Sequence, residues 1–472
     1  MEGESRKEGR WAAAIFAVLF ALFFVLRQES YWSDARHLIR SVNEGLLQRH
    51  HFAYPSIAYG FHWLTTLFGN TEAKLSLQLL SALSGAVSGA LLFLTARRLG
   101  FDLYVALVGV ALMCFSPVVS FYATCVEVHA LQLAFATGAT YWAVCQRDAD
   151  SRSAVVAALF LTGIFGSHMA GLLWGPALLV FVCWSGAKPR LPRHALGGVA
   201  VMLLAALGWC LANPGSGGEG QTHIGRSLQD LLTVIRPKVL YATLLTPTGI
   251  LWIGGLLTLF TFRRRWRELL RHPLPLATVV LLACMLPFAG TLRTPERGAY
   301  YITLVLPLSL MTCHLIQQAN PGLRRLVPLV LLLQIFLGAK QYYEWELAYP
   351  GSEWIPALQE QTGEKGIIIA KELWEWNAIQ FHTKLTSISP SMPQPPNSTI
   401  ASRGEDVIVR MMNIERKRGG TLGVTRNFWE SSDPLEVRWQ ELLRQNFGEP
   451  IEGSRPEFLM FANHGPERRE SD

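Results

Sequence analysis

Apolar runs that could cross a lipid bilayer recur through the first 340 residues of the chain. A hydrocarbon core about 30 Å thick requires about 17–25 apolar residues per helix. Charged residues make up only 16% of the chain, against about 25% in an ordinary soluble domain, which argues against a soluble enzyme. The pattern predicts an α-helical polytopic membrane protein with about eleven transmembrane helices, at residues 11–26, 75–96, 103–122, 128–145, 153–167, 169–184, 196–212, 240–262, 273–292, 299–316 and 324–338.

The count depends on residues 153–184, which could form one long tilted helix or two short helices broken at Gly166-Ser167-His168. Cytoplasmic loops carry an excess of Lys and Arg. With two helices, the loops on the N-terminal side hold the cluster Arg263 to Arg271, whereas one helix would place that cluster outside. We therefore expect eleven spans, a cytoplasmic N-terminus and an extracytoplasmic C-terminus.

The net charge of +7 also fits a membrane protein, because the basic residues form short clusters between apolar runs. No nucleic-acid partner is expected. The seven cysteines lie in or beside the apolar runs without CxxC or Cys/His spacing, so neither a disulfide framework nor a zinc site is predicted. Residues 11–26 follow a charged start as in a secretory signal, but Arg27-Gln28-Glu29 comes next in place of a cleavage site, which indicates an uncleaved first span.

The tail has an ordinary charge content, with 15 basic and 20 acidic residues in 339–472. Short apolar stretches at Gly366–Ala370, Thr421–Thr425 and Phe458–Ala462 predict strands, and Asp433–Phe447 predicts a helix. We expect a transmembrane domain over residues 1–340 and a small α/β extracytoplasmic domain over residues 341–472.

Candidate catalytic acids lie in the loops expected outside. Asp34 follows the first span, where partial burial raises a carboxyl pKa and makes the group a better proton acceptor. The alternative is that Asp34 caps a helix over Ala35–Asn43. Glu127 precedes His129 at the edge of a span, where ionisable groups tend to be functional, or it complements the dipole of the following helix. His168 lies at the next outside boundary, as a site residue or in a plain interfacial turn.

Two arginines, Arg293 and Arg297, lie in an outside turn against the positive-inside tendency. Guanidinium groups bind phosphate through bidentate, charge-assisted hydrogen bonds, so a phosphate at the outer interface would explain them. Contacts with Glu296 or with lipid headgroups are the alternative.

The order of Asp34, then His51-Phe52-Ala53-Tyr54-Pro55, then Glu127-Val128-His129-Ala130-Leu131, then His168 resembles the multi-spanning GT-C glycosyltransferases. Within that superfamily the chain is similar to bacterial relatives of protein O-mannosyltransferases and aminoarabinose transferases. The resemblance covers about residues 10–320. Phe52-Ala53 replaces the Pro-Gly of that group and His129 replaces a Tyr, which bears on the substrate more than on the fold.

The resemblance implies inverting transfer of a sugar, a mannose-like hexose or a pentose, from a polyprenyl-phosphate donor to an acceptor hydroxyl outside the membrane. Asp34 would be the general base, and Arg293 and Arg297 would stabilise the leaving phosphate. Glu127 is the second candidate catalytic residue. The remaining candidate substrate-binding residues are His51, Tyr54, His129, His168 and Tyr301.

No cofactor is expected to be required; a divalent metal bridging Asp34 and Glu127 is known in relatives but is not favoured, because a donor with a single phosphate does not demand one. The acceptor, whether protein, lipid or glycan, is open. We expect a multi-pass protein of the bacterial inner membrane with a periplasmic C-terminal domain. The alternative function is a polytopic transporter or lipid flippase, which would need ionisable residues near mid-membrane, whereas the spans are nearly free of them.

Overall fold

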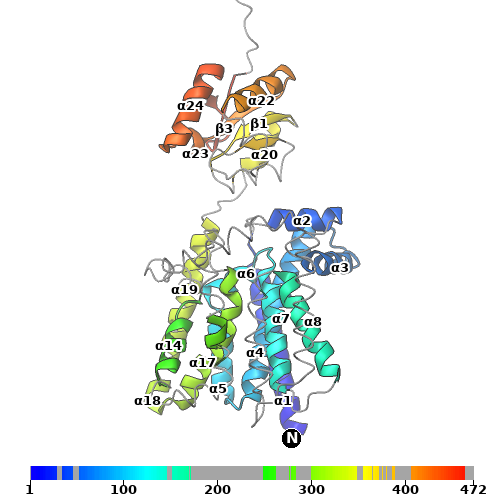
Figure 1. Ribbon diagram of the computed structural model, residues 1–472, viewed down its shortest axis with the longest axis vertical. Coiled ribbons are helices and arrows are strands. Elements are labelled where there is room, and N and C mark those ends of the chain that lie inside the picture. Colours follow the sequence, from blue (N-terminus) through cyan, green and yellow to red (C-terminus); the bar gives the residue numbers. More distant parts are fainter. Residues whose placement is uncertain are drawn as a thin grey trace, which may run out of the picture. The chain divides into compact units, whose positions relative to one another are not determined.

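The computed structural model describes residues 2–28, 35–45, 53–145, 151–168, 171, 248–261, 276, 278–282, 299–347, 354–363, 365–371, 375, 379, 385–388 and 405–462. The chain divides into two compact units (Figure 1). The helical unit contains Met1–Gln28 and His37–Leu347, and the sheet unit contains Glu29–Arg36 and Ala348–Asp472.

The two longest described helices of the helical unit, α1 (Glu2–Val25) and α4 (Ala73–Arg98), pack antiparallel. Near their shared end, Arg97 Nε donates to Glu8 Oε1 at 3.2 Å. Gly89 allows close approach, because a Cβ there would lie 2.3 Å from Cδ1 of Leu19. Small residues at such contacts are the usual means by which membrane helices pack tightly.

Residues 103–122 form two helices, α5 (Leu103–Cys114) and α6 (Pro117–Tyr122), so the prediction of one continuous helix is wrong. Pro117 has no amide hydrogen to continue the ladder of α5, and it instead takes the first position of α6. The later helix α19 (Val327–Leu347) approaches the break, since a Cβ at its Gly338 would lie 2.5 Å from the Phe115 carbonyl oxygen.

Helices α7 (His129–Cys145) and α8 (Ser151–Ser167) interlock reciprocally. A Cβ at Gly138 of α7 would lie 2.5 Å from the Phe160 ring, and a Cβ at Gly163 of α8 would lie 2.5 Å from the Phe135 ring. Each ring therefore occupies the space that a glycine leaves on the partner helix. Helix α8 ends at Ser167, inside the break predicted at 166–168; the span expected at 169–184 lies outside the described residues.

The run expected as a span at 240–262 is interrupted at Gly249 and Ile250, before α14 (Leu251–Thr261), so a single uninterrupted helix is wrong here too. Gly249 has φ +61°, a conformation that favours glycine. The fully buried Gln334 of α19 satisfies the freed backbone groups: its Oε1 accepts from Ile250 N at 2.9 Å, and its Nε2 donates to Thr248 O at 3.2 Å and to Leu112 O at 3.1 Å. Irregular backbone inside a membrane protein requires such partners.

The short 3₁₀ helix η5 (Ala299–Leu304) leads into α17 (Val305–Gln318), which runs antiparallel to α5. At one end, Gln317 Oε1 accepts from Asp102 N at 3.2 Å, and farther along, Cys313 Sγ contacts Val105 O at 3.5 Å. The opposite direction of the two helices places η5 at the other end of the unit, where it packs against α6 and α7. A short helix α18 (Pro321–Arg324) connects α17 to α19.

By length and composition, three described helices could cross a membrane, at Arg6–Val25, Ala73–Arg98 and Pro321–Tyr343. The helical, membrane-type architecture agrees with the sequence-based expectation. Eleven spans stay a prediction, because several of the expected spans lie wholly or partly outside the described residues.

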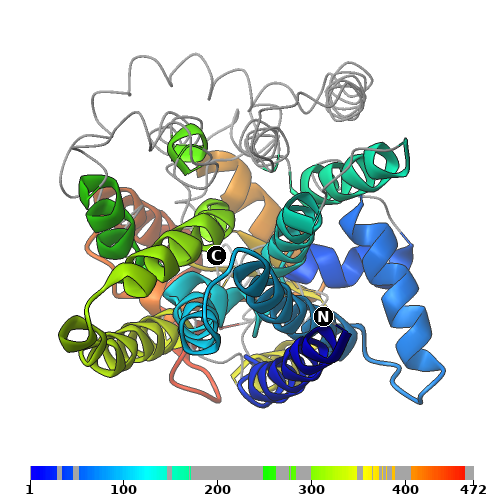
Figure 2. The same ribbon diagram turned by 90° about the horizontal axis from the view of Figure 1, so that it is seen from below.

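Two further helices, α2 (Ala35–Glu44) and α3 (Tyr54–Thr66), precede α4. They lie across the direction of the long helices, and α3 extends sideways beyond α1 and α4 (Figures 1 and 2). The helix predicted at Ala35–Asn43 is confirmed by α2.

The sheet unit contains five strands in the order β2-β1-β3-β5-β4, with β1, β2 and β3 parallel and the other pairings antiparallel. The strands predicted near 366–370, 421–425 and 458–462 and the helix predicted at 433–447 are confirmed. The elements are α20 (Trp354–Thr362), β1 (Gly366–Ile369), β2 (Thr386–Ile388), α22 (Glu405–Lys417), β3 (Thr421–Thr425), α23 (Arg426–Trp429), α24 (Pro434–Phe447), β4 (Ile451–Glu452) and β5 (Phe458–Met460).

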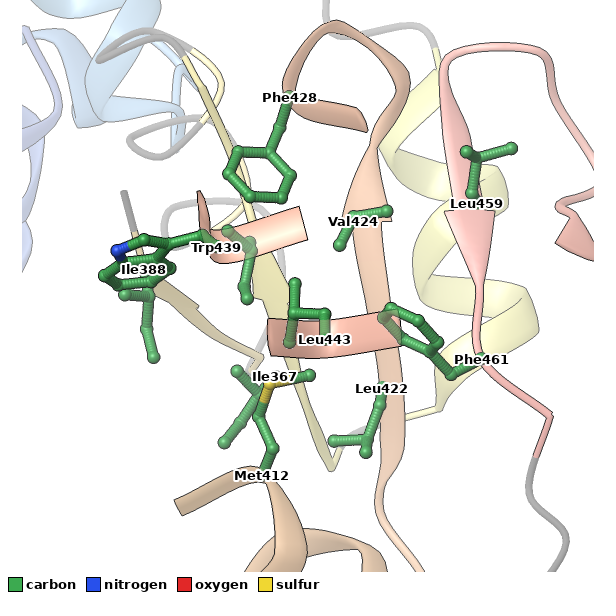
Figure 3. Close-up of a cluster of buried hydrophobic side chains, with 11 residues drawn as sticks. Ile367, Ile388, Met412, Leu422, Val424, Phe428, Trp439, Leu443, Leu459 and Phe461 are labelled. Carbon is green, nitrogen blue, oxygen red and sulfur yellow. The ribbon is translucent and has the colours of Figure 1, made fainter. Parts of the chain in front are cut away.

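Both faces of this sheet bury apolar side chains, as expected of strands covered on both sides. On one face, Ile367, Leu422 and Val424 pack with Met412 of α22 and Leu443 of α24 (Figure 3). The other face packs against α20 through a second cluster. Figure 3 shows the side chains of α22 and α24 directed toward the strands.

Candidate functional site

Gln28, whose side-chain amide is buried, ties the end of α1 to the loop between α6 and α7. Gln28 N donates to Thr124 O at 2.9 Å, and its Nε2 donates to Phe121 O at 3.1 Å and to Thr124 Oγ1 at 2.9 Å. The Gln28 carbonyl in turn accepts from Gln78 Nε2 of α4 at 2.6 Å. Three segments that are distant in sequence therefore meet at one end of the helical unit.

The same loop carries Glu127, whose side chain is only 4% exposed. Its Oε2 accepts from the backbone N of Val128 at 3.2 Å, and its carbonyl oxygen is 3.5 Å from Ser81 Oγ of α4. A buried carboxylate is costly unless it has polar partners, and such groups concentrate at functional sites. Among the described residues of the helical unit, Glu127 is therefore the buried acid with a case for a role in chemistry.

Tyr54, the first residue of α3, is buried and close enough to this acid for the charge of Glu127 to act on its phenol. The Ala53 backbone N donates to Gly166 O at 3.0 Å, which ties the start of α3 to the end of α8. Burial and then the negative charge of Glu127 raise the pKa of Tyr54 above its ordinary value, so the phenol stays protonated at physiological pH. Within the described part of the chain, its hydroxyl has no hydrogen-bond partner.

Two histidines complete this group. The His129 and His168 rings lie 5.0 Å apart between centroids with an interplanar angle of 42°. The Tyr122 ring meets His129 edge-on at 5.1 Å, and Gln132 Nε2 lies 3.4 Å from His168 O. The start of α7 and the end of α8 thus present two imidazoles side by side, His129 buried and His168 half-buried.

Tyr301 lies in η5 and is buried. Because η5 packs against α6 and α7, this residue belongs to the same end of the unit as Glu127 and His129. Arg293 and Arg297 precede η5 and lie outside the described residues. Asp34, directly before α2, and His51, three residues before Tyr54, also lie outside them.

The structure therefore brings together Tyr54, Glu127, His129 and His168, with Tyr301 at the same end. The roles assigned to these residues, and to the four outside the described part, stay predictions. Sequence reasoning missed Gln28, Gln78 and Tyr122, which hold the group in place. The only signal for Gln28 and Gln78 is an amide beside or inside an apolar run, which does not reveal its partner.

The described residues contain no group of three or more His, Cys, Asp or Glu side chains placed to hold a metal ion. Asp34, the other residue considered for a bridging metal, lies outside the described residues. Glu127 alone supplies one oxygen-bearing side chain, which fits a hard divalent cation but does not define a site.

Comparisons with known proteins bear on this arrangement. The structure is similar to that of ArnT from Cupriavidus metallidurans in the apo state, with a TM-score of 0.62, 13% identity and coverage of 97% of this chain and 98% of that chain. Residues 54–210 match the model of the dolichyl-phosphate-mannose-protein mannosyltransferase family. The fold is that of the GT-C glycosyltransferases. This confirms the resemblance drawn from the sequence.

Two further structures share the GT-C fold. The Archaeoglobus fulgidus oligosaccharyltransferase in complex with zinc and sulfate gives a TM-score of 0.55 at 12% identity, covering 95% of this chain and 73% of that chain. AglB of the same organism, in complex with an inhibitory peptide and a dolichol-phosphate, gives 0.53 at 12% identity, covering 96% and 74%. No curated protein matches the chain by sequence.

The region matched by the family model includes four of the candidate site residues, Tyr54, Glu127, His129 and His168. Together, the family match and the GT-C fold favour a membrane glycosyltransferase over the transporter or flippase alternative.

Proposed function

We propose that this protein transfers a sugar from a polyprenyl-phosphate donor to an acceptor hydroxyl at the extracytoplasmic face of a bacterial inner membrane. The observation that carries the proposal is the meeting of Tyr54, Glu127, His129 and His168 at one end of a GT-C-type helical unit, within the region matched by the mannosyltransferase family model. The sugar, a mannose-like hexose or a pentose, and the acceptor are left open.

The chemistry follows from the donor. When the bond between the anomeric carbon and the phosphate oxygen breaks, a lipid phosphate dianion leaves without needing a proton. Preorganised cations lower the barrier to such a departure, and Arg293 and Arg297 are proposed for this role. The acceptor oxygen attacks from the opposite face, which inverts the anomeric centre, and its proton passes to a carboxylate.

Asp34 is proposed as that carboxylate. It lies six positions after Gln28, which the hydrogen bonds described above fix beside the Glu127 loop. A chain of six residues spans at most about 22 Å, so this tether is compatible with a shared site. Glu127 is proposed to orient Asp34 or the acceptor, and Tyr54 to donate a hydrogen bond to the donor phosphate or sugar.

The membrane arrangement is part of the proposal. Eleven spans would place the N-terminus in the cytoplasm and the C-terminal domain in the periplasm. The transfer is proposed to need no cofactor, because the leaving phosphate requires positive charge that the two arginines can provide.

The test uses the purified full chain in liposomes with a radiolabelled polyprenyl-phosphate sugar and a membrane extract as acceptor source. Asp34→Asn should lower the transfer rate by about 100- to 10,000-fold, the usual range for loss of a general base. A matched control is Asp102→Asn, since Asp102 lies at the opposite end of the helical unit, where its Oδ1 caps α5 and Asn can take its place.

Near-normal transfer by Asp34→Asn would refute the base assignment. The double variant Arg293→Ala/Arg297→Ala should chiefly raise the Michaelis constant for the donor, and an unchanged constant would refute the phosphate contact. Movement of the intact donor across the bilayer without sugar transfer would instead support the flippase alternative.

A further inference from the structure

An apolar groove of about 700 Å³ lies among α14, α17 and α19, which gather on one side of the helical unit (Figures 1 and 2). Its walls include Ile253 and Leu257 of α14, Leu315 of α17, and Val330 and Leu333 of α19. Pockets that hold small organic ligands usually have volumes of about 300–1,000 Å³. The groove is therefore large enough to hold an organic ligand.

The groove opens on the surface of the helical unit. Several of the residues that line it are themselves exposed, with 49% for Leu257 of α14 and 47% for Leu333 of α19. An enclosed cavity would bury such side chains. Because α19 belongs to the candidate membrane span Pro321–Tyr343, the open side of the groove faces the acyl chains of the bilayer.

The length of the groove fits within one leaflet. One end lies at Asn320, in the connection between α17 and α18, and the other includes Ile250, whose backbone N donates to Gln334 at the break before α14. Along α19 the lining extends from Val327 to Leu333, which is about 9 Å. Half of a hydrocarbon core is about 15 Å thick. An occupant that enters at Asn320 therefore comes from the leaflet on the α18 side.

The interior of the groove favours a hydrocarbon chain. Away from the end at Asn320, Thr312 is the one polar side chain among the described lining residues, and its Oγ1 already donates to Leu308 O of the same helix at 2.8 Å. A polar group placed there would lose its hydrogen bonds to water without gaining new ones. An acyl chain has no such cost, and it restores the dispersion contacts that an empty groove lacks.

The mouth of the groove at Asn320 is positively charged. Arg324 and Arg325 follow directly in the chain, and residues 305–326 contain no Asp or Glu. Arg324 Nη1 donates to Asp102 Oδ2 at 3.3 Å, whereas Arg325 is exposed. One positive charge is therefore in excess beside the apolar groove. Guanidinium groups bind phosphate oxygens, and basic residues at a membrane surface attract anionic headgroups.

We propose that this groove is a binding site for one membrane phospholipid, with an acyl chain between α14 and α19 and the lipid phosphate at Arg325. A phospholipid combines the two features that the groove requires, an apolar chain and an anionic head at one end. The site lies at the opposite end of the helical unit from the Glu127 loop, and the proposal does not depend on sugar transfer. The bound chain packs beside the break before α14 and stabilises it.

Native mass spectrometry of the full chain, released from nanodiscs of phosphatidylethanolamine and phosphatidylglycerol, tests the proposal. The unsubstituted protein should retain one phospholipid per chain. Val330→Trp fills the groove with an indole ring and should lower the retained fraction at least five-fold. Leu329→Trp is the matched control, because Leu329 is the adjacent residue of α19, is 65% exposed and does not line the groove. It should retain the lipid as the unsubstituted protein does.

Equal retention by the two tryptophan variants would overturn the proposal, as would an unsubstituted protein without retained phospholipid. Thermal unfolding reports whether each variant folds, and Leu257→Trp fills the groove from α14 if Val330→Trp does not fold.

Two additions test the identity and the position of the lipid. An added polyprenyl phosphate should leave the phospholipid in place, and its displacement would assign the groove to the donor lipid and overturn the proposal. Arg325→Gln should lower the retention of phosphatidylglycerol several-fold, whereas Arg418→Gln at an exposed position of the sheet unit should not. Equal retention by these two variants would refute the phosphate contact.

Discussion

Replacing Tyr54 by Phe removes one oxygen atom from a side chain that is 1% exposed. Among the described residues, that oxygen has no hydrogen-bond partner. A buried hydroxyl without a partner costs about 1–3 kcal/mol, so its removal should leave the free energy of unfolding unchanged or raise it by about that amount. The apolar packing of the ring at the start of α3 is retained.

Transfer activity should respond in the opposite direction. If the hydroxyl donates to the charged donor phosphate, its loss removes about 1.5–3 kcal/mol of binding in the transition state. At about 1.4 kcal/mol per factor of ten, the ratio kcat/KM should fall by roughly 10- to 150-fold. The assays are thermal unfolding in detergent, followed by tryptophan fluorescence, and donor-dependent transfer in liposomes.

Tyr59→Phe is the matched control for this experiment, because Tyr59 lies on the same helix and is 53% exposed. It should change neither the unfolding temperature nor kcat/KM. A lower unfolding temperature for Tyr54→Phe would show that the hydroxyl supports the fold. Full activity at unchanged stability would refute its contact with the donor.

Three further predictions follow from other parts of the molecule. Gln334→Leu should lower the free energy of unfolding by about 2–5 kcal/mol, because it leaves the backbone groups at the break before α14 without hydrogen-bond partners. The control is Leu333→Ala, at an exposed position of the same helix. Equal unfolding temperatures for the two variants would refute the prediction. Glu375→Ala should destabilise the sheet unit by about 2–4 kcal/mol, because Glu375 accepts from Thr425 Oγ1 and Asn427 Nδ2, and hydrogen exchange at β1 and β3 measures the loss. Treatment with EDTA should change the transfer rate by less than about two-fold, and a larger loss that Mg²⁺ or Mn²⁺ restores would establish a metal requirement.

Short motifs in the sequence predicted an important part of the candidate site. Glu127 and His129 are adjacent to the start of α7, and His168 directly follows α8, so the expected hairpin of two spans brings them together. The sequence predicted that all three residues lie at outside boundaries of spans, and the structure adds the ring contact between His129 and His168. Asp34 and Arg293 lie outside the described residues, and their approach to Glu127 is still a prediction.

The features that the sequence did not reveal depend on long-range polar contacts. Gln28 and Gln334 each form hydrogen bonds that join segments distant in the chain. A hydropathy profile shows each of them only as a single polar residue and does not indicate its partner. The interruptions at Pro117 and Gly249 were also missed, because apolar composition continues through them. Hydropathy measures transfer to lipid, whereas the backbone pairing at a break depends on the partner helix.

The reciprocal packing of glycine and phenylalanine between α7 and α8 has a consequence for the two histidines. Gly138 lies nine residues, or about 14 Å, from His129 along α7, while Gly163 lies five residues before His168. Each phenylalanine ring fills the space beside a glycine of the other helix. This packing prevents either helix from sliding along the other or rotating about its own axis. The distance between the two imidazoles therefore depends on side-chain packing in the apolar interior. A methyl group added at Gly138 would change that distance without touching either ring.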